Sequence, residues 1–206
     1  ILNNIGMILI NGGNLDAAES AFQRARDVLP DCPNSYVNTA LVYKWRVDYP
    51  KAFEWVNKAL ALNPWHSQAQ FTLSMLLLVS GDYLRGFQEY ECRWRDKSNG
   101  LRKIVSDCPE WDGTNGKCVY IYGEQGAGDS ILMLRYARLI KSLGIRQAWV
   151  AQKGLKPLIQ TMPEIDEVVD AGDVLPDFDC HLPAASLPLM FGTTIDNIPP
   201  APYIPK

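Results

Sequence analysis

The sequence predicts an α-helical solenoid followed by a small α/β domain with a mainly parallel sheet. Small and apolar residues recur every 34 positions over the first hundred residues, as at Gly6, Ala40 and Ser74. A β-branched and aromatic run at 118–122 then leads into a glycine-rich loop. Beyond that loop, short apolar runs alternate with helical segments. This alternation is typical of parallel strands joined by helices.

The first hundred residues read as three copies of one helical pair. Several other positions keep the same spacing: Ala18, Ala52 and Gly86; Phe22, Val56 and Tyr90; and the prolines Pro30 and Pro64. Small residues allow two helices to approach closely, and a proline ends each second helix. The pattern resembles the tetratricopeptide repeat and covers residues 1–98.

One position of the repeat carries Asn4, Asn38 and Thr72, on the first helix of each pair. An asparagine there offers a donor and an acceptor to the amides of an extended peptide, whatever its sequence. The row resembles two rungs of the asparagine ladder that grips substrate peptides in repeat-bearing O-linked N-acetylglucosamine transferases. We therefore expect a protein or peptide partner in this groove. A solvated polar groove with no ligand is the alternative.

Residues 99–116 are rich in turn formers and charge, which predicts a linker, and 117–206 form the α/β domain. The predicted strands and helices of that domain follow in chain order: strands at 118–122, 147–151, 166–170 and 177–182, and helices at 131–140, 155–162 and 186–191. The proline-rich stretch 199–205 is expected to be extended.

The loop after the first strand is the candidate site. Glycines at 123, 126 and 128 favour a sharp backbone turn, and Asp129 and Ser130 are suited to cap the next helix. Backbone amides at the start of a helix favour an anionic or hydroxyl-rich ligand. We therefore predict a binding loop that includes Gly126, Gly128 and Ser130.

Three further side chains are candidates for contacts in this site. Glu124 and Gln125 either hydrogen-bond ligand hydroxyls or satisfy amides of the loop itself. His181 is expected at a strand end, where parallel sheets bind ligands, as an acid–base group or as a structural histidine. The glycine spacing reverses that of a dinucleotide fingerprint, and no Lys-Ser/Thr pair follows the loop as in a P-loop, so the sequence predicts neither motif.

Composition argues against several kinds of partner. The net charge of −3 argues against nucleic acid and anionic membranes. No apolar run approaches the roughly 20 residues that span a bilayer. The five scattered cysteines lack metal-ligand spacing and predict neither a metal site nor a disulfide framework, which points to the cytoplasm. Because the first residue is Ile, we expect the chain to be cut from a longer one.

The order of these pieces resembles a bacterial family in which tetratricopeptide repeats precede a glycosyltransferase domain related to heptosyltransferases. The motifs that carry the resemblance are Tyr90-Glu-x-Arg-Trp94, Pro109-x-Trp-Asp-Gly113, Gly123-Glu-Gln-Gly-x-Gly-Asp129, Arg135-Tyr136, Leu175-Pro-x-Phe-Asp179, Ser186-Leu-Pro188, Phe191-Gly-Thr-Thr194, Ile198-Pro and Pro202-Tyr203. They cover essentially the whole chain. Each motif alone is weak, and the set together is specific.

The resemblance implies a GT-B architecture, in which two Rossmann-like domains enclose the active site. The first domain binds the acceptor, here a sugar or glycan, and the second binds a nucleotide-sugar donor. Asp129 matches the proposed base, which takes the proton of the attacking hydroxyl; an N-cap alone is the other interpretation. The donor half is not expected within these residues, so the fragment would be inactive alone and needs no cofactor. A non-catalytic interaction scaffold is the rival function, and a nucleotide-binding regulator is a weaker one.

Overall fold

The structure is a computed structural model that describes residues 1–95, 100–114, 116–170, 172–174, 176–201 and 203–204. Positions 99 and 115 of the predicted linker, and positions 175 and 202 of the motifs above, lie outside the described residues. The chain divides into two compact units, Ile1–Asn99 (unit 1) and Gly100–Lys206 (unit 2). Among the described residues, none of the helices has the length and apolar character that crossing a bilayer requires.

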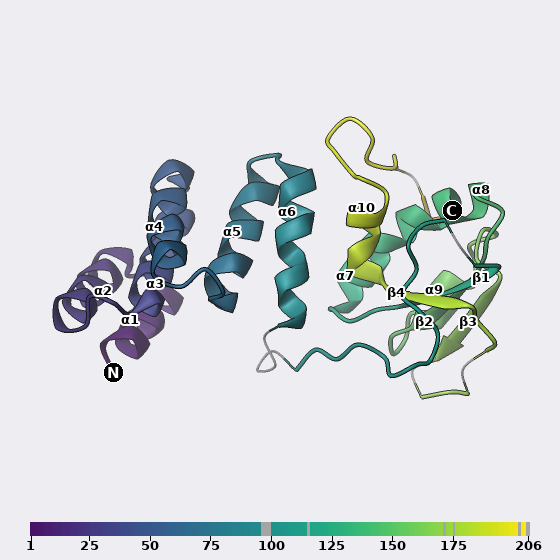
Figure 1. The fold of residues 1–206 in the computed structure, drawn as a ribbon, viewed down its shortest axis with the longest axis horizontal. Coiled ribbons are helices and arrows are strands. Elements are labelled where there is room, and N and C mark those ends of the chain that lie inside the picture. The colour runs from purple at the N-terminus through teal and green to yellow at the C-terminus, as the bar shows by residue number, and fades with distance from the viewer. Residues whose placement is uncertain (96–99, 115, 171, 175, 202, 205–206) are drawn as a thin grey trace. The chain divides into compact units, whose positions relative to one another are not determined.

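Unit 1 consists of antiparallel helical pairs (Figure 1). Its helices are α1 Leu2–Asn11, α2 Leu15–Val28, α3 Pro33–Trp45, α4 Tyr49–Leu62, α5 Ser67–Val79 and α6 Tyr83–Tyr90, followed by the 3₁₀ helix Glu91–Trp94. Each odd-numbered helix packs on the next even-numbered one, and α3 also contacts both α1 and α5. The predicted tetratricopeptide-like helical repeats are confirmed.

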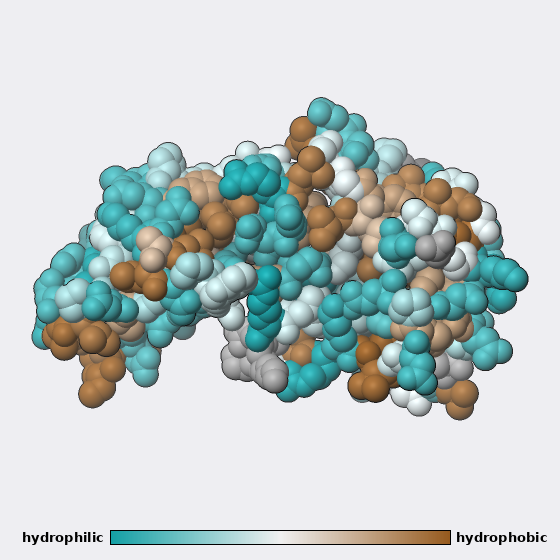
Figure 2. Space-filling view, viewed as in Figure 1, coloured by the Kyte–Doolittle hydropathy of each residue, from teal (hydrophilic) through white to brown (hydrophobic). Residues whose placement is uncertain are grey.

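The recurring small residues lie where the helices of a pair meet. Ala18 and Ala52 are fully buried. A Cβ at Gly6 would lie 2.2 Å from the Phe22 ring, and one at Gly86 would lie 2.7 Å from Leu78. A larger side chain at either position would require the Phe22 ring or the Leu78 side chain to shift. At the end of unit 1 that holds the N-terminus, apolar surface is exposed (Figure 2), with Ile1, Val28 and Leu29 all more than half exposed.

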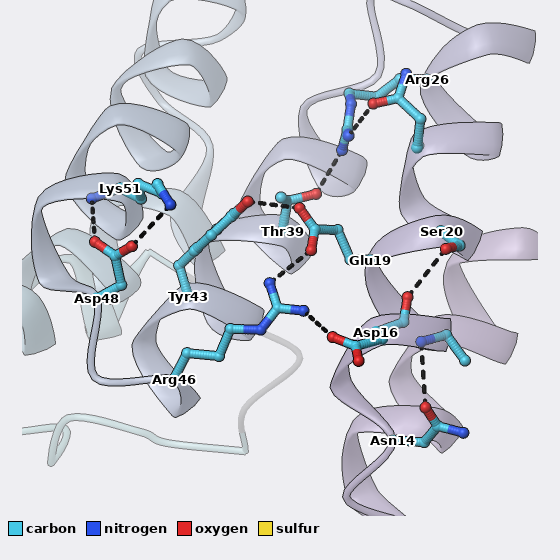
Figure 3. A network of polar contacts seen from close by, with 12 residues as sticks. Asn14, Asp16, Glu19, Ser20, Arg26, Thr39, Tyr43, Arg46, Asp48 and Lys51 are labelled. Atoms are coloured by element: carbon cyan, nitrogen blue, oxygen red, sulfur yellow. Dashed lines mark hydrogen bonds and ion pairs between the residues drawn. The ribbon is translucent and has the colours of Figure 1, made fainter.

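The second helix of each pair begins with the same capping contact. Asn14, Asp48 and Asp82 each accept a hydrogen bond from the backbone N–H three residues later, at 3.2, 3.2 and 3.4 Å (Figure 3 shows the first two). The three residues are 34 positions apart. A side chain that accepts from such an orphan N–H stabilises a helix by about 1 kcal/mol. The period of 34 is therefore a period of polar caps as well as of core contacts.

Unit 2 contains a four-stranded, fully parallel sheet with the order β3-β2-β1-β4. Its strands are β1 Cys118–Tyr122, β2 Arg146–Ala151, β3 Glu167–Asp170 and β4 Cys180–Pro183. Its α-helices are α7 Ala127–Met133, α8 Ala137–Ser142, α9 Lys156–Ile159 and α10 Leu187–Met190. The predicted mainly parallel sheet is confirmed.

Some element bounds differ from the prediction. The helix expected at 131–140 begins at Ala127 and is divided into α7 and α8 by a 3₁₀ turn, Leu134–Tyr136. The helix expected at 155–162 is limited to α9. The strand expected at 177–182 begins only at Cys180, because Asp179 is used as an acceptor for the amides of Lys117 and Cys118 (2.9 and 2.8 Å).

The two faces of the sheet are covered differently. Val119 and Ile121 face a core to which α7, α8, α9 and α10 all contribute. Tyr120 and Tyr122 point to the other face, where Phe178 stacks on Tyr120 with ring centroids 4.9 Å apart. This second core contains no helical residue among those described. The helices of unit 2 therefore pack on one face of the sheet.

The segment before β1 belongs to unit 2. The backbone of Pro109–Trp111 pairs with His181, through Trp111 N–H to His181 O (2.8 Å) and His181 N–H to Pro109 O (3.1 Å). The Trp111 ring is 2% exposed and meets Phe191 edge-on at 6.1 Å. This stretch, predicted as part of a linker, packs into the core of unit 2.

Candidate functional site

The candidate site lies at the carboxyl-terminal edge of the sheet, directly after β1. Tyr122, the last residue of β1, is paired with Val150 on one side and Pro183 on the other. The chain then leaves the sheet at Gly123 and enters α7 at Ala127. Loops at this edge are where parallel sheets bind ligands.

Contacts from distant parts of the chain hold the loop. The Gln152 side chain, just after β2, donates to the Gln125 carbonyl. The Glu124 carboxylate accepts from the Ala185 amide at 3.5 Å. Glu124 and the Gln125 backbone therefore serve the loop itself. Contacts of either residue with a ligand stay a prediction.

Asp129 was predicted as an N-cap, and the structure corrects this. The N-cap of α7 is Gly126, and Asp129 is the third residue of the helix. Its carboxylate accepts a hydrogen bond from the Gly126 N–H at 3.0 Å, which is half of a capping box. The side chain is exposed at the surface. Asp129 therefore supports the helix start from within the helix and keeps contact with solvent.

Ser130, the other predicted cap, lies inside the helix and is 6% exposed. Its hydroxyl is buried and has no hydrogen-bond partner among the described residues. A Cβ at Gly123 would lie 2.5 Å from this hydroxyl and 3.1 Å from the Gln152 amide nitrogen. A buried hydroxyl without a partner costs about 1–3 kcal/mol. Glycine at 123 is therefore required by close packing.

The three loop glycines differ in how much the packing requires them. Gly123, Gly126 and Gly128 are not among the glycines with positive φ, so the close contact at Gly123 is a matter of space and not of a left-handed backbone. A Cβ at Gly126 would lie 3.3 Å from Asp129, and one at Gly128 would meet nothing within 4 Å. Packing within the chain therefore does not require glycine at 128.

The loop, α7 and the turn after β4 enclose a hollow. Its lining includes Glu124, Gln125, Asp129 and Ser130, which are four of the seven site residues predicted for unit 2, together with Ala185. The hollow is narrow, with essentially no volume that a water molecule could fill. Small-molecule pockets commonly have about 300–1,000 Å³. Among the described residues, no three His, Cys, Asp or Glu side chains gather closely enough to hold a metal ion.

His181 does not join this group. It is the second residue of β4, not its end, and its partner in register is Tyr120. Its ring lies between Tyr122 (5.9 Å) and Phe178 (6.5 Å), on the face opposite the helices. Burial lowers the pKa of His181, although the charge of Glu110 acts in the opposite direction. The prediction that His181 lies beside the loop is wrong, because strand alternation turns its side chain to the other face.

The three predicted peptide contacts in unit 1 differ in exposure. Asn4 is exposed, whereas Asn38 and Thr72 are 5% and 3% exposed. The Asn38 amide lies 3.4 Å from the Asn3 side chain, and the Thr72 hydroxyl donates to the Gln68 carbonyl of its own helix at 2.8 Å. They do not form the exposed row that was expected. Their binding of a peptide stays a prediction.

The sequence analysis did not predict two sets of residues, namely exposed polar residues of the repeats and a distant side chain that holds the loop after β1. Asn34 and Gln68 lie at one repeat position and are exposed, and their spacing of 34 residues was the signal that could have found them. Gln152 fastens the loop from 27 residues away. No local pattern in the sequence indicates that contact.

No protein-family model matches the sequence, and no curated protein matches it. Among solved structures, the chain is similar to the first tetratricopeptide domain of Spaghetti bound to an HSP90 peptide, with 22% identity over 44% of this chain and 74% of that chain and a TM-score of 0.42. It is also similar to the Sgt2 tetratricopeptide domain from Aspergillus fumigatus, with 24% identity over 52% and 68% and a TM-score of 0.43. An O-GlcNAc transferase from Thermobaculum terrenum matches with 14% identity over 84% of this chain and 41% of that chain, at a TM-score of 0.42. At these TM-scores the likenesses add nothing to what the helices and strands themselves establish.

Proposed function

We propose that unit 2 supplies the acceptor side of a glycosyl-transfer site and that unit 1 binds a protein or peptide partner. The observation that carries the first part is the grouping of Glu124, Asp129 and Ser130 around one hollow after β1. The two carboxylates are hydrogen-bond acceptors, and the buried Ser130 hydroxyl has no hydrogen-bond partner among the described residues. Such a group suits a ligand rich in hydroxyl groups. The sheet order, with β1 between β2 and β4, is that of the first four strands of a doubly wound, Rossmann-like sheet.

In this proposal Asp129 is the base. Its carboxylate is exposed at the hollow. One carboxylate oxygen accepts a hydrogen bond from the Gly126 N–H, and this bond orients the other oxygen. Asp129 would take the proton of an acceptor hydroxyl as the oxygen attacks the sugar carbon of a nucleotide-sugar donor, while the bond from that carbon to the nucleotide's phosphate breaks and the nucleotide leaves. The donor itself would be bound by residues outside this chain. Because the hollow is narrow, the acceptor would bind at its mouth.

The experiment is a glycan array probed with the labelled full chain. We expect retention of at least one glycan, a loss of retention in Ser130→Ala, and retention close to the parent in Asp129→Asn, which keeps the shape and the acceptor to Gly126. Transfer in a protein that also holds a donor domain should then fall by about 10²–10⁴-fold in Asp129→Asn. Equal retention by the chain and by Ser130→Ala would remove the acceptor site.

For unit 1, we propose that the partner binds along the side formed by α1, α3 and α5. These helices are neighbours, and exposed polar side chains on them include Asn4, Asn34 and Gln68. A pull-down with the full chain, repeated with the double variant Asn34→Ala, Gln68→Ala, tests this. Loss of a captured peptide in the double variant is the expected result, and Glu54→Ala on α4 is the matched control.

A non-catalytic interaction scaffold is the second candidate function. The narrowness of the hollow beside Ser130 favours it. The scaffold predicts a peptide partner for unit 1 and no glycan for unit 2, so the same array separates the two functions.

A further inference from the structure

Unit 1 also contains a hollow that is lined by residues of α2, α3 and α4. Its volume of about 540 Å³ is within the range of small-molecule pockets, about 300–1,000 Å³. Its lining includes Arg26, Tyr36, Trp55, Lys58, Ala61 and Leu62. It therefore combines two cations, two aromatic rings and aliphatic surface.

Arg26 is a buried cation whose described hydrogen bonds all go to uncharged groups. Its side chain extends from α2 toward Thr39 on α3 (Figure 3), and the residue is 7% exposed. Its Nη1 donates to the Thr39 hydroxyl and, at 3.3 Å, to the Ser35 carbonyl, and its Nη2 donates to the Gln23 side chain at 2.7 Å. No carboxylate of the described residues forms an ion pair with it.

Some N–H donors of Arg26 make no hydrogen bond to the described residues. A guanidinium has five N–H donors, and the three hydrogen bonds above use three of them. The Nε–H and one Nη2–H have no protein partner among the described residues. Buried charges are normally paired, because removing an unpaired charge from water is costly. An anion in the hollow would satisfy this requirement.

The walls of the hollow are flat and apolar. The Arg26 guanidinium lies 4.4 Å from the centre of the Trp55 ring and 5.6 Å from that of Tyr36. Lys58 also lies over Trp55, at 4.2 Å. The two rings are 5.9 Å apart and tilted by 45°. They offer an apolar body beside the charge a surface on which to pack.

The charges present indicate a ligand with a single negative charge. Lys58 already pairs with Glu54 at 2.6 Å. Asp27, another lining residue, accepts from Gln23 at 2.8 Å and would repel a second negative charge. Arg26 is the lining cation that forms no direct ion pair with the described residues, although the charges of Asp27 and Glu19 act on it from a greater distance. A guanidinium matches a planar carboxylate, whereas a phosphate brings nearly two charges at neutral pH.

We propose that this hollow binds a small organic carboxylate whose aromatic or aliphatic body packs on Trp55, Tyr36 and Leu62. The site is separate from the proposed acceptor site on unit 2 and does not depend on it.

Titration of the full chain with benzoate, followed by the Trp55 indole N–H signal in NMR, tests the proposal. We expect a saturable shift with benzoate. Benzamide, its neutral analogue, should bind at least about tenfold more weakly, because it brings no negative charge to Arg26; a tenfold change is about 1.4 kcal/mol. Phenylphosphonate should bind more weakly than benzoate. A signal that moves linearly without saturation, or equally with benzoate and benzamide, would overturn the proposal.

Arg26→Gln should abolish the shift, but it also removes contacts between α2 and α3, so a surface variant is needed. Leu62→Glu places a negative charge at the hollow without disturbing the core, because Leu62 is 42% exposed. Leu84→Glu is the matched control, at a leucine that is 49% exposed and outside the hollow. We expect the first variant to lose benzoate binding and the second to keep it. Equal binding by both variants would contradict the site.

Discussion

The repeated capping contacts of unit 1 and the contacts that hold the sheet of unit 2 differ in range. In unit 1 the caps Asn14, Asp48 and Asp82 each accept from a residue three positions away. In unit 2 the contacts that close the fold join residues about sixty apart, such as Asp179 with Cys118 and Glu124 with Ala185. Short-range contacts leave a pattern in the sequence, and long-range contacts leave none. The difference explains why one unit was predictable in detail and the other only in outline.

The largest expected effect separates the cores of the two units. Trp111→Ala removes a ring that is 2% exposed from the core of unit 2. Such truncations cost about 3–5 kcal/mol. Hydrogen exchange should show the amides of β1 and β2 losing protection, while those of α3 and α4 keep theirs. Equal loss of protection in both sets would mean that the units do not unfold separately.

A smaller effect is expected at the repeated caps. Asp48→Ala removes the acceptor for the Lys51 N–H and should destabilise unit 1 by about 1 kcal/mol. Denaturant unfolding followed by circular dichroism measures it. Asp48→Asn is the control, because it keeps an acceptor and should recover most of the loss. If the alanine variant matches the parent, the caps do not contribute to unit 1.

Replacing Val47 with glycine should change the stability of unit 1 by a similar amount, in the opposite direction. Val47 occupies the repeat position of Gly13 and Gly81, and like them it has a positive φ, of 62°. A β-branched residue in this conformation is strained by about 1–3 kcal/mol. Val47→Gly should raise the denaturation midpoint of unit 1, in part offset by the greater freedom of glycine in the unfolded chain. Gly81→Val, the reciprocal change, should lower the midpoint. A lower midpoint for Val47→Gly would show that no strain is stored there.

The smallest effect is a pH dependence of unit 2. Because the pKa of His181 is lowered in the folded state, the unfolded chain binds more protons between the two pKa values, and stability rises with pH in that window. The contribution is complete above the unfolded value of about 6.5 and is lost as the pH falls through the lowered folded pKa. Denaturation midpoints between about pH 7.5 and 5 should fall more in the parent than in His181→Phe. An identical fall in both proteins would assign the dependence to other groups.

Sequence reasoning reached the repeats, the parallel sheet and the position of the loop, because each depends on local pattern. It did not reach the N-cap at Gly126, because glycine at that position has no capping side chain to recognise. It also misplaced His181, since the face that a strand residue takes depends on its register with the neighbouring strand, which a slip of one residue reverses. The burial of Asn38 and Thr72 depends on contacts between helices, which the repeat pattern alone does not specify.

The most direct test of the proposed acceptor site uses Gly128. Apart from its chain neighbours and the nearby backbone of its own helix, no described residue lies within 4 Å of a Cβ at this position, and glycine disfavours a helix by roughly 0.5–1 kcal/mol relative to alanine. Gly128→Ala should therefore stabilise unit 2 while it weakens retention of a glycan that approaches the loop backbone. Both quantities are measured on the same protein, by denaturation and on the array. Higher stability with lower retention is the predicted result, and higher stability with unchanged retention would contradict a ligand at this loop.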